Sequence, residues 1–165
     1  MTEPPLFPDE QVATADERSV LATFLDYYRT EVVRKARGVS EQDARRRLVP
    51  SLTTIGGLVK HLTVVEESWF LRRMGARDDL PPRMPTEQEF TLSDDDTVES
   101  LIAAYEKQCA LSREVASAHE LDDNVPHHRL GRVSLRWIYV HMIEETARHA
   151  GHLDILREQI DGETG

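Results

Sequence analysis

Apolar side chains recur every three or four residues in four long segments of this chain, which is the spacing of amphipathic α-helices. The four segments cover about residues 15–37, 54–74, 97–119 and 134–161. Strand-like alternation is almost lacking, and long connections cover residues 75–93 and 121–133. Connections of this length in a compact domain are often functional covers or crossovers. The pattern predicts an all-α fold, a four-helix bundle whose connections are longer than tight turns.

The length of 165 residues fits a single domain. Residues 1–13 are predicted to form an extended arm because prolines block a helix there. The prolines are Pro4, Pro5 and Pro8. Thr14 and Glu17 have the spacing of a capping box, so we expect the helical domain to span residues 14–162.

The fourth segment, which Ser134 is expected to cap, carries polar residues in the middle of its apolar seam. The seam runs through Leu135, Ile138, Met142, Glu145, His149, His152 and Leu156. A carboxylate and two imidazoles at buried positions are costly unless something pairs with them. A metal ion is the simplest partner for Glu145, His149 and His152 together, and the succession of three ligand types favours a metal site.

Two structural interpretations of the same residues stay open at this point. Glu145 can form a salt bridge with a histidine or an arginine of another helix. His149 and His152 can be ordinary hydrogen-bonded histidines of the core.

The second segment offers a further candidate, His61, at the flank of its apolar seam. From that position the side chain can reach into the interior of a bundle or hydrogen-bond at its edge. Gly56 and Gly57, near the start of the segment, permit the close approach of a neighbouring backbone. His127 and His128 follow a proline in the last connection, and we interpret them as exposed loop histidines without a metal role.

The amino-acid composition excludes some classes of binding partner. A formal charge of -10 argues against binding to nucleic acid or to an anionic membrane surface. The proline-rich, acidic N-terminus is unlike a signal peptide and no apolar run is long enough to span a membrane, so we expect a cytoplasmic protein. The single cysteine, Cys109, excludes an internal disulfide and is interpreted as a small buried hydrophobe rather than a nucleophile.

Two sequence motifs resemble the DinB/YfiT-like superfamily of metal-binding four-helix bundles. They are the segments Gly57–Leu62 and His141–His152, and the resemblance extends from about Phe24 to Gly162. Many members have a histidine in the second helix and a His-x-x-x-His pair in the last helix. Here Glu145 takes the first place of that pair and His149 the second.

The glutamate is similar to that of the mycothiol-dependent maleylpyruvate isomerase branch, in which two histidines and a glutamate hold zinc. The resemblance implies that His61, Glu145 and His149 are metal ligands here. It implies that His152 either supports the ligands from outside or faces the open coordination position, where it can move a proton as a catalytic group. The isomerases carry a further C-terminal domain, and the likeness is greatest to stand-alone members. Imidazole and carboxylate ligands suit zinc first, with nickel or iron as alternatives.

The function implied by this resemblance is a metal-dependent transferase or isomerase. It would use a low-molecular-weight thiol such as mycothiol on a small electrophilic substrate. The alternatives are a metal-dependent hydrolase with the same ligands and a non-enzymatic, stress-related protein that binds a metal or a small ligand. Glu66 or Glu67 is a candidate to orient His61, and helical geometry does not choose between them.

A homodimer is also expected, since bundles of this superfamily often pair through long helices. The apolar flank of the fourth segment, at Tyr139, Ile143 and Leu153, is the candidate contact. The same flank can instead pack inside the bundle.

Overall fold

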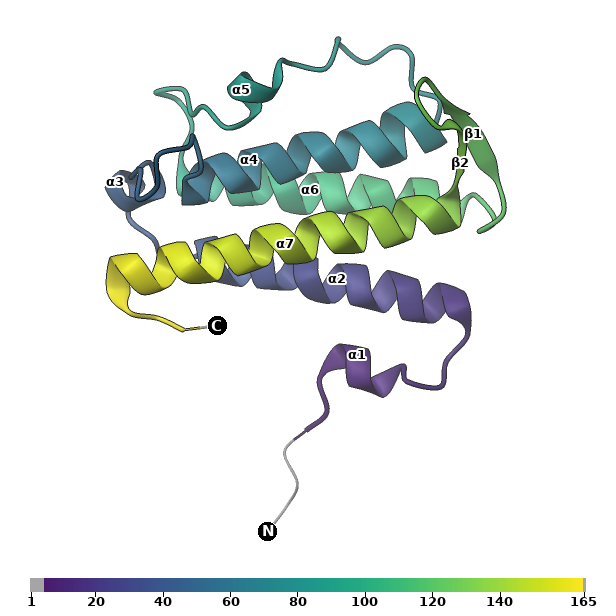
Figure 1. The fold of residues 1–165 in the computed structure, drawn as a ribbon, viewed down its shortest axis with the longest axis horizontal. Helices are drawn as coiled ribbons and strands as arrows, with labels where there is room; N and C mark the ends of the chain where they lie inside the picture. The colour runs from purple at the N-terminus through teal and green to yellow at the C-terminus, as the bar shows by residue number, and fades with distance from the viewer. Residues whose placement is uncertain (1–4, 165) are drawn as a thin grey trace.

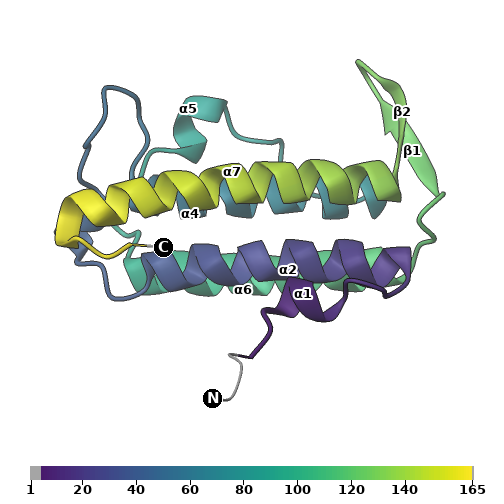
Figure 2. The same ribbon diagram turned by 60° about the horizontal axis from the view of Figure 1, so that its bottom comes forward.

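Four long helices lie side by side in a computed structural model that describes residues 5–164 (Figure 1). They are α2 (Glu17–Ala36), α4 (Ile55–Glu66) with its π-helical continuation η1 (Glu67–Met74), α6 (Val98–Ser117) and α7 (Leu135–Asp161). In Figure 2 α4 and α7 form one layer and α2 and α6 the other, and α2 packs closely against α7. The chain is mostly helical, as the sequence predicts, and the long helices end within a few residues of the expected limits.

The short elements correct the sequence prediction at the N-terminal end of the chain. Residues 8–11 form the helix α1 (Pro8–Gln11) instead of an extended arm, because a proline is well tolerated in the first turn of a helix. The arm prediction for residues 1–4 lies outside the described residues. The cap of α2 is Asp16, which accepts a hydrogen bond from the Ser19 amide, and not Thr14.

Residues 121–133 contain a β-hairpin where a plain loop was predicted. Strands β1 (Asn124–His127) and β2 (Gly131–Ser134) pair antiparallel, with Val125 opposite Val133. Gly131 has a φ of 74°, which suits the end of a three-residue hairpin loop. Pro126 obscured the strand in the sequence, but a proline is compatible with an edge strand.

Inside the second long helix, residues 67–74 are π-helical rather than α-helical, which the apolar seam did not indicate. Just before this change lies Glu66, whose side chain is fully buried in the core together with Arg29 of α2. Two parallel hydrogen bonds join them, at 2.7 Å from Nε to Oε1 and 2.6 Å from Nη2 to Oε2. A buried charge pair of this kind holds α2 to α4 as long as both partners are present.

The flank of α7 that suggested a homodimer is used inside the molecule. Tyr139 and Leu153 are buried, and Ile143 is partly buried against the core cluster near the hairpin. This flank therefore no longer supports a homodimer, which stays a prediction. None of the helices within residues 5–164 is long and apolar enough to cross a membrane.

Cys109 is buried, as expected, with 3% of its surface exposed. Burial and the nearby charge of Glu66 raise the pKa of its thiol to about 12, from a usual value of 9.0. A thiol whose pKa is raised by folding contributes stability below its unfolded pKa, and this contribution is lost as the pH rises toward the folded pKa.

We therefore expect Cys109 to be unreactive toward a thiol-specific disulfide reagent at pH 8 in the native protein and to react at once in denaturant. We also expect the native protein to lose stability from pH 9 upward, and Cys109→Ala to flatten that loss. Rapid labelling of the native chain at pH 8 would contradict the assigned burial.

The connection between η1 and α6 contains α5 (Thr86–Glu89) and runs back along α4 (Figure 1). A Cβ placed on Gly57 would lie 2.6 Å from the carbonyl oxygen of Phe90, which follows α5. The predicted close approach of a backbone at the paired glycines is thus confirmed. The contact seats the connection directly on the first turn of α4.

We expect Gly57→Ala to lower the free energy of unfolding by about 1–3 kcal/mol, since a backbone oxygen must move to make room for the methyl group. Gly151→Ala in α7 is the control, because its Cβ would meet open space within the described structure. That variant should gain about 0.5–1 kcal/mol from the lower backbone entropy of alanine. Urea denaturation of both variants measures the two changes, and equal effects would contradict the close contact.

Candidate metal centre

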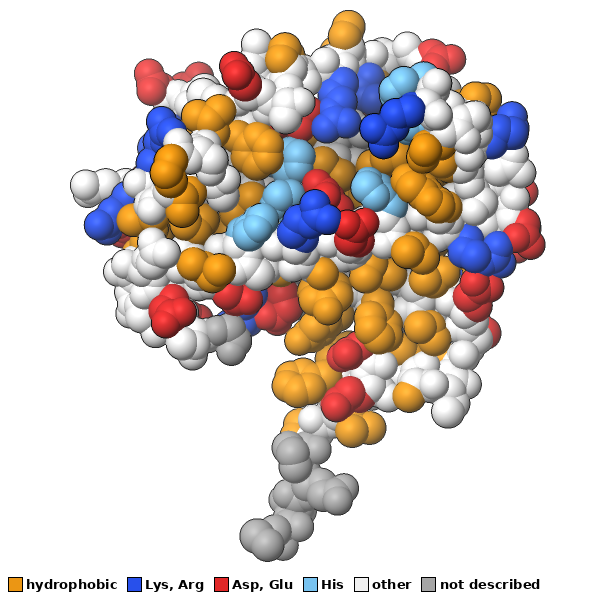
Figure 3. All heavy atoms as spheres, viewed as in Figure 1, with side chains coloured by type: hydrophobic (Ala, Val, Ile, Leu, Met, Phe, Trp, Pro, Cys, Tyr) orange, Lys and Arg blue, Asp and Glu red, His pale blue; other side chains and the backbone are white. Residues whose placement is uncertain are grey.

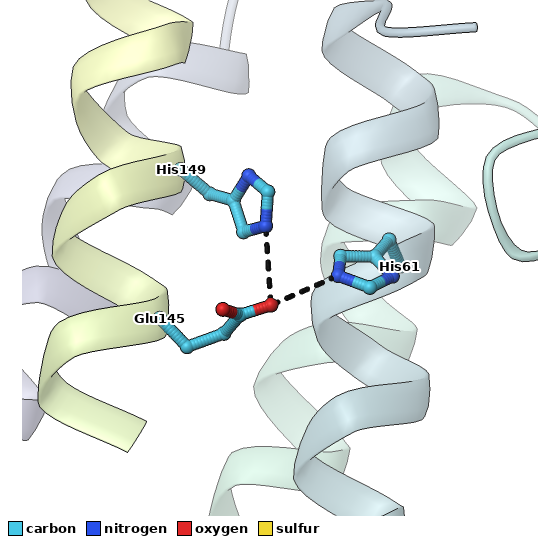
Figure 4. Close-up of side chains that lie close together, drawn as sticks. All are labelled: His61, Glu145 and His149. Atoms are coloured by element: carbon cyan, nitrogen blue, oxygen red, sulfur yellow. Dashed lines mark hydrogen bonds and ion pairs between the residues drawn. The ribbon is translucent and has the colours of Figure 1, made fainter. Parts of the chain in front are cut away.

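Three ligand-type side chains from two facing helices converge between these helices (Figure 4). His61 comes from α4, and Glu145 and His149 come from α7. The Nε2 atoms of His61 and His149 each lie 3.2 Å from the same carboxylate oxygen, Oε1 of Glu145. One ligand atom from each residue lies within 4.8 Å of the others. The structure therefore brings together the three residues that the resemblance implied.

The helical spacing explains this convergence. Glu145 and His149 are one turn apart on α7 and therefore project from the same side of that helix. His61 is buried with 7% of its surface exposed, while Glu145 and His149 are partly exposed. Histidine side chains gather on the outer face of α4 and α7 in Figure 3. The cluster is thus anchored in the core on the His61 side and open to solvent on the other.

His152 is the one member of the predicted seam that the structure leaves exposed. The apolar ends of the seam are buried as expected, but the helix turns its middle toward the open face. The Nδ1 atom of His152 lies 3.2 Å from Nδ1 of His149, so it contacts the cluster from outside. Desolvation and the charge of His149 lower the pKa of His152, which favours its neutral, proton-accepting form.

Glu89 of α5 is the residue that sequence reasoning missed. Its carboxylate is fully buried, and its Oε2 lies 2.9 Å from Nδ1 of His61. The two earlier candidates for this place point elsewhere, since Glu66 pairs with Arg29 and Glu67 with Arg72. The length of this connection indicates a functional cover, but an irregular segment has no period from which the direction of one carboxylate can be predicted.

The hydrogen bonds of the cluster define its charge. Those from His149 and then His61 hold the pKa of Glu145 well below its usual range, so this carboxylate is ionised. A neutral His61 that donates its Nδ1 proton to Glu89 has a lone pair on Nε2. That lone pair faces another acceptor, Oε1 of Glu145, so the contact requires either a second ring proton or a cation. Two imidazole nitrogens and one carboxylate oxygen also form a donor set that suits a divalent metal ion.

An aromatic cluster lies beside this centre and corrects the interpretation of His127. The side chain is buried rather than exposed, and its ring stacks on Trp69 at 5.6 Å between centroids. Trp137 and His141 of α7 stack on each other at 5.0 Å and also contact Trp69. The hairpin folds onto η1, and His127 is buried in this contact. The next residue, His128, is exposed as predicted. No metal role was expected for either histidine.

The helices and the cluster define a mostly helical protein with a His-Glu-His centre between two helices. Residues 20–162 match the model of the mycothiol S-transferase family, and the chain belongs to this family. The match confirms the resemblance to the DinB/YfiT-like superfamily, of which this family is a member. A comparison with curated proteins finds no matching sequence.

Proposed function

We propose that this protein is a metal-dependent transferase that joins mycothiol to a small electrophilic substrate. The convergence of His61, Glu145 and His149 in a member of the mycothiol S-transferase family is the observation that carries this proposal. The three residues would hold a divalent ion, zinc in the first place and nickel or iron as alternatives. We also infer that the four long helices form a four-helix bundle of the DinB/YfiT-like kind.

A divalent ion bound at this centre would supply Lewis-acid chemistry that lowers the pKa of a thiol. The chain's own residues divide the remaining tasks. Glu145 and the two histidines present their ligand atoms toward the open face, and the buried position of His61 keeps water from that side. Cys109 is buried in the core, so the reacting thiol must come from outside the chain.

We propose that His152 takes the proton of the thiol. It lies at the exposed edge of the centre, 3.2 Å from His149, with a lowered pKa. In the transfer, the thiol loses its proton to this imidazole and its sulfur forms a bond to the electrophilic carbon. In a substitution, the electron pair of the broken bond leaves with the displaced group. In an addition, the carbon next to the attacked carbon receives the proton.

A cavity of about 350 Å³ supports a small apolar substrate next to His152. Its walls come from α7 and from the segment that precedes α4. They include Val49, Thr53, Ile155 and Leu156. A cavity of this size falls at the lower end of the usual range for small-molecule sites.

The test begins with elemental analysis of the purified protein, followed by reaction with mycothiol and monochlorobimane as a reporter electrophile. We expect a stoichiometric divalent metal and a metal-dependent rate of conjugate formation, measured by fluorescence and mass spectrometry. Turnover of ester or amide substrates without thiol would favour the hydrolase instead. A loaded protein without either activity would favour a binding protein.

A further inference from the structure

We infer that Glu89 is a positioning residue of the metal centre, which fixes His61 so that its Nε2 atom faces Glu145 and His149. This inference rests on the proposed function, because it assumes that the cluster holds a metal. It concerns a residue outside the ligand set, carried by the connection that runs along α4.

The burial of Glu89 is the first observation. The other three residues of α5 are exposed, yet the Glu89 side chain is fully buried at 0% exposure. A buried carboxylate is costly unless charged or hydrogen-bonding groups surround it. Both of its oxygens are engaged, Oε1 with Nε of Arg83 at 2.7 Å and Oε2 with Nη2 of Arg83 at 3.0 Å and Nδ1 of His61 at 2.9 Å.

The second observation is that the His61 ring is held on three sides. Glu89 contacts Nδ1, Glu145 contacts Nε2, and the Phe90 ring stacks on the imidazole with 4.2 Å between centroids. A flip of the imidazole would put the carbon atoms Cδ2 and Cε1 in the places of Nδ1 and Nε2 and would break the contacts with Glu89 and Glu145. With a cation at the centre, the Nδ1 proton is donated to Glu89 and the lone pair of Nε2 is left for the cation.

Glu89 acts through His61 and is not a fourth ligand. It contacts the nitrogen of the imidazole that points away from Glu145, whereas the cluster of possible ligand atoms contains only His61, Glu145 and His149 among the described residues. A carboxylate bonded to a ligating histidine orients the ring and raises its basicity, and its loss typically lowers metal affinity about 10–100-fold.

The same contact joins the connection to the centre. Next to Glu89, the backbone of Phe90 rests on Gly57, and the Thr91 carbonyl accepts a hydrogen bond from Lys60. These neighbours pack against α4 whether or not a metal is bound. Glu89 is different, because its partner His61 would be immobilised by the metal. We therefore expect metal binding to slow amide hydrogen exchange around α5.

The experiment compares Glu89→Gln with Glu87→Gln, an exposed glutamate on the same short helix. Zinc affinity of the apo-proteins is measured by competition with a chelating dye at equal folded fraction, checked by circular dichroism. We expect Glu89→Gln to lower the affinity about 10–100-fold and Glu87→Gln to leave it unchanged. In Glu89→Gln, zinc should no longer slow amide exchange around α5. In addition, the NMR resonance of the Nδ1 proton of zinc-bound His61 should be lost in this variant.

Zinc binding by the wild-type protein distinguishes a failure of the proposed function from a failure of the positioning role of Glu89. Failure of the wild type to bind zinc, nickel or iron would refute the proposed function. Tight binding by the wild type with equal affinity in Glu89→Gln would overturn the positioning role alone. A variant that only loses thermal stability, while its folded fraction binds zinc normally, would also overturn it, because Glu89 would then be purely structural.

Discussion

His149→Ala is expected to empty the metal centre, whereas His152→Ala is expected to leave it loaded and remove most of the transferase activity. A three-ligand site reduced to two ligands binds a divalent ion poorly, and the loss should exceed the roughly 10–100-fold that removal of an outer partner costs. His152 contacts His149 from the exposed side and lies outside the group of atoms that can hold one ion. Metal content by elemental analysis and the rate of conjugate formation measure the two effects.

His128→Ala provides the matched control, because His128 is an exposed histidine of the hairpin. This variant should keep both the metal and the activity. All variants are compared at equal folded fraction, since loss of a partly buried ligand also disturbs the packing of α7 against α4. An empty site in His152→Ala together with a full site in His149→Ala would reverse the assigned roles.

Arg29→Leu should have the largest effect on stability. The change leaves the carboxylate of Glu66 buried without its partner, at a cost of about 3–5 kcal/mol in the free energy of unfolding. For a chain of this size the corresponding fall in Tm is roughly 6–20 °C. Guanidinium and thermal denaturation of metal-free protein at pH 7 measure the change without a contribution from the metal centre.

Two companion variants isolate the cause. Arg34→Leu removes an exposed arginine from the same helix, where its pair with Glu31 is solvated, and should cost only about 0–1 kcal/mol. The double variant Arg29→Leu with Glu66→Leu removes both buried charges and should be more stable than Arg29→Leu alone. Equal stability of the single and double variants would mean that lost packing, and not the unpaired carboxylate, accounts for the effect.

The features that could be predicted from the sequence are those that follow from the spacing of apolar and polar residues. Apolar spacing gave the positions of the four long helices, and the polar break in the last seam led to Glu145 and His149. His61 was a weak candidate by spacing alone and needed the family resemblance. Periodicity also failed where it was extended too far, because it treated His152 as buried, although α7 turns that position toward the open face.

The remaining features depend on contacts that a polar and apolar pattern does not encode. Glu89 lies in an irregular connection, and its partner His61 is 28 residues away, so only the fold brings them together. The shift from α- to π-helix at Glu67 moves each side chain by a fraction of a turn and leaves the seam recognisable. The hairpin at residues 124–134 was hidden by Pro126 and by a loop-like run of polar residues.

The two halves of the centre are separated by 84 residues along the chain, from His61 to Glu145. In an unfolded chain only Glu145 and His149 are close to each other, because they are four residues apart in the sequence. A cation held by both helices would therefore staple a long loop, and the entropy of closing such a loop grows only with the logarithm of its length. A contact that forms only after both helices are in place slows unfolding more than it speeds folding, so a cation bound to the folded centre would chiefly prolong the lifetime of the folded chain.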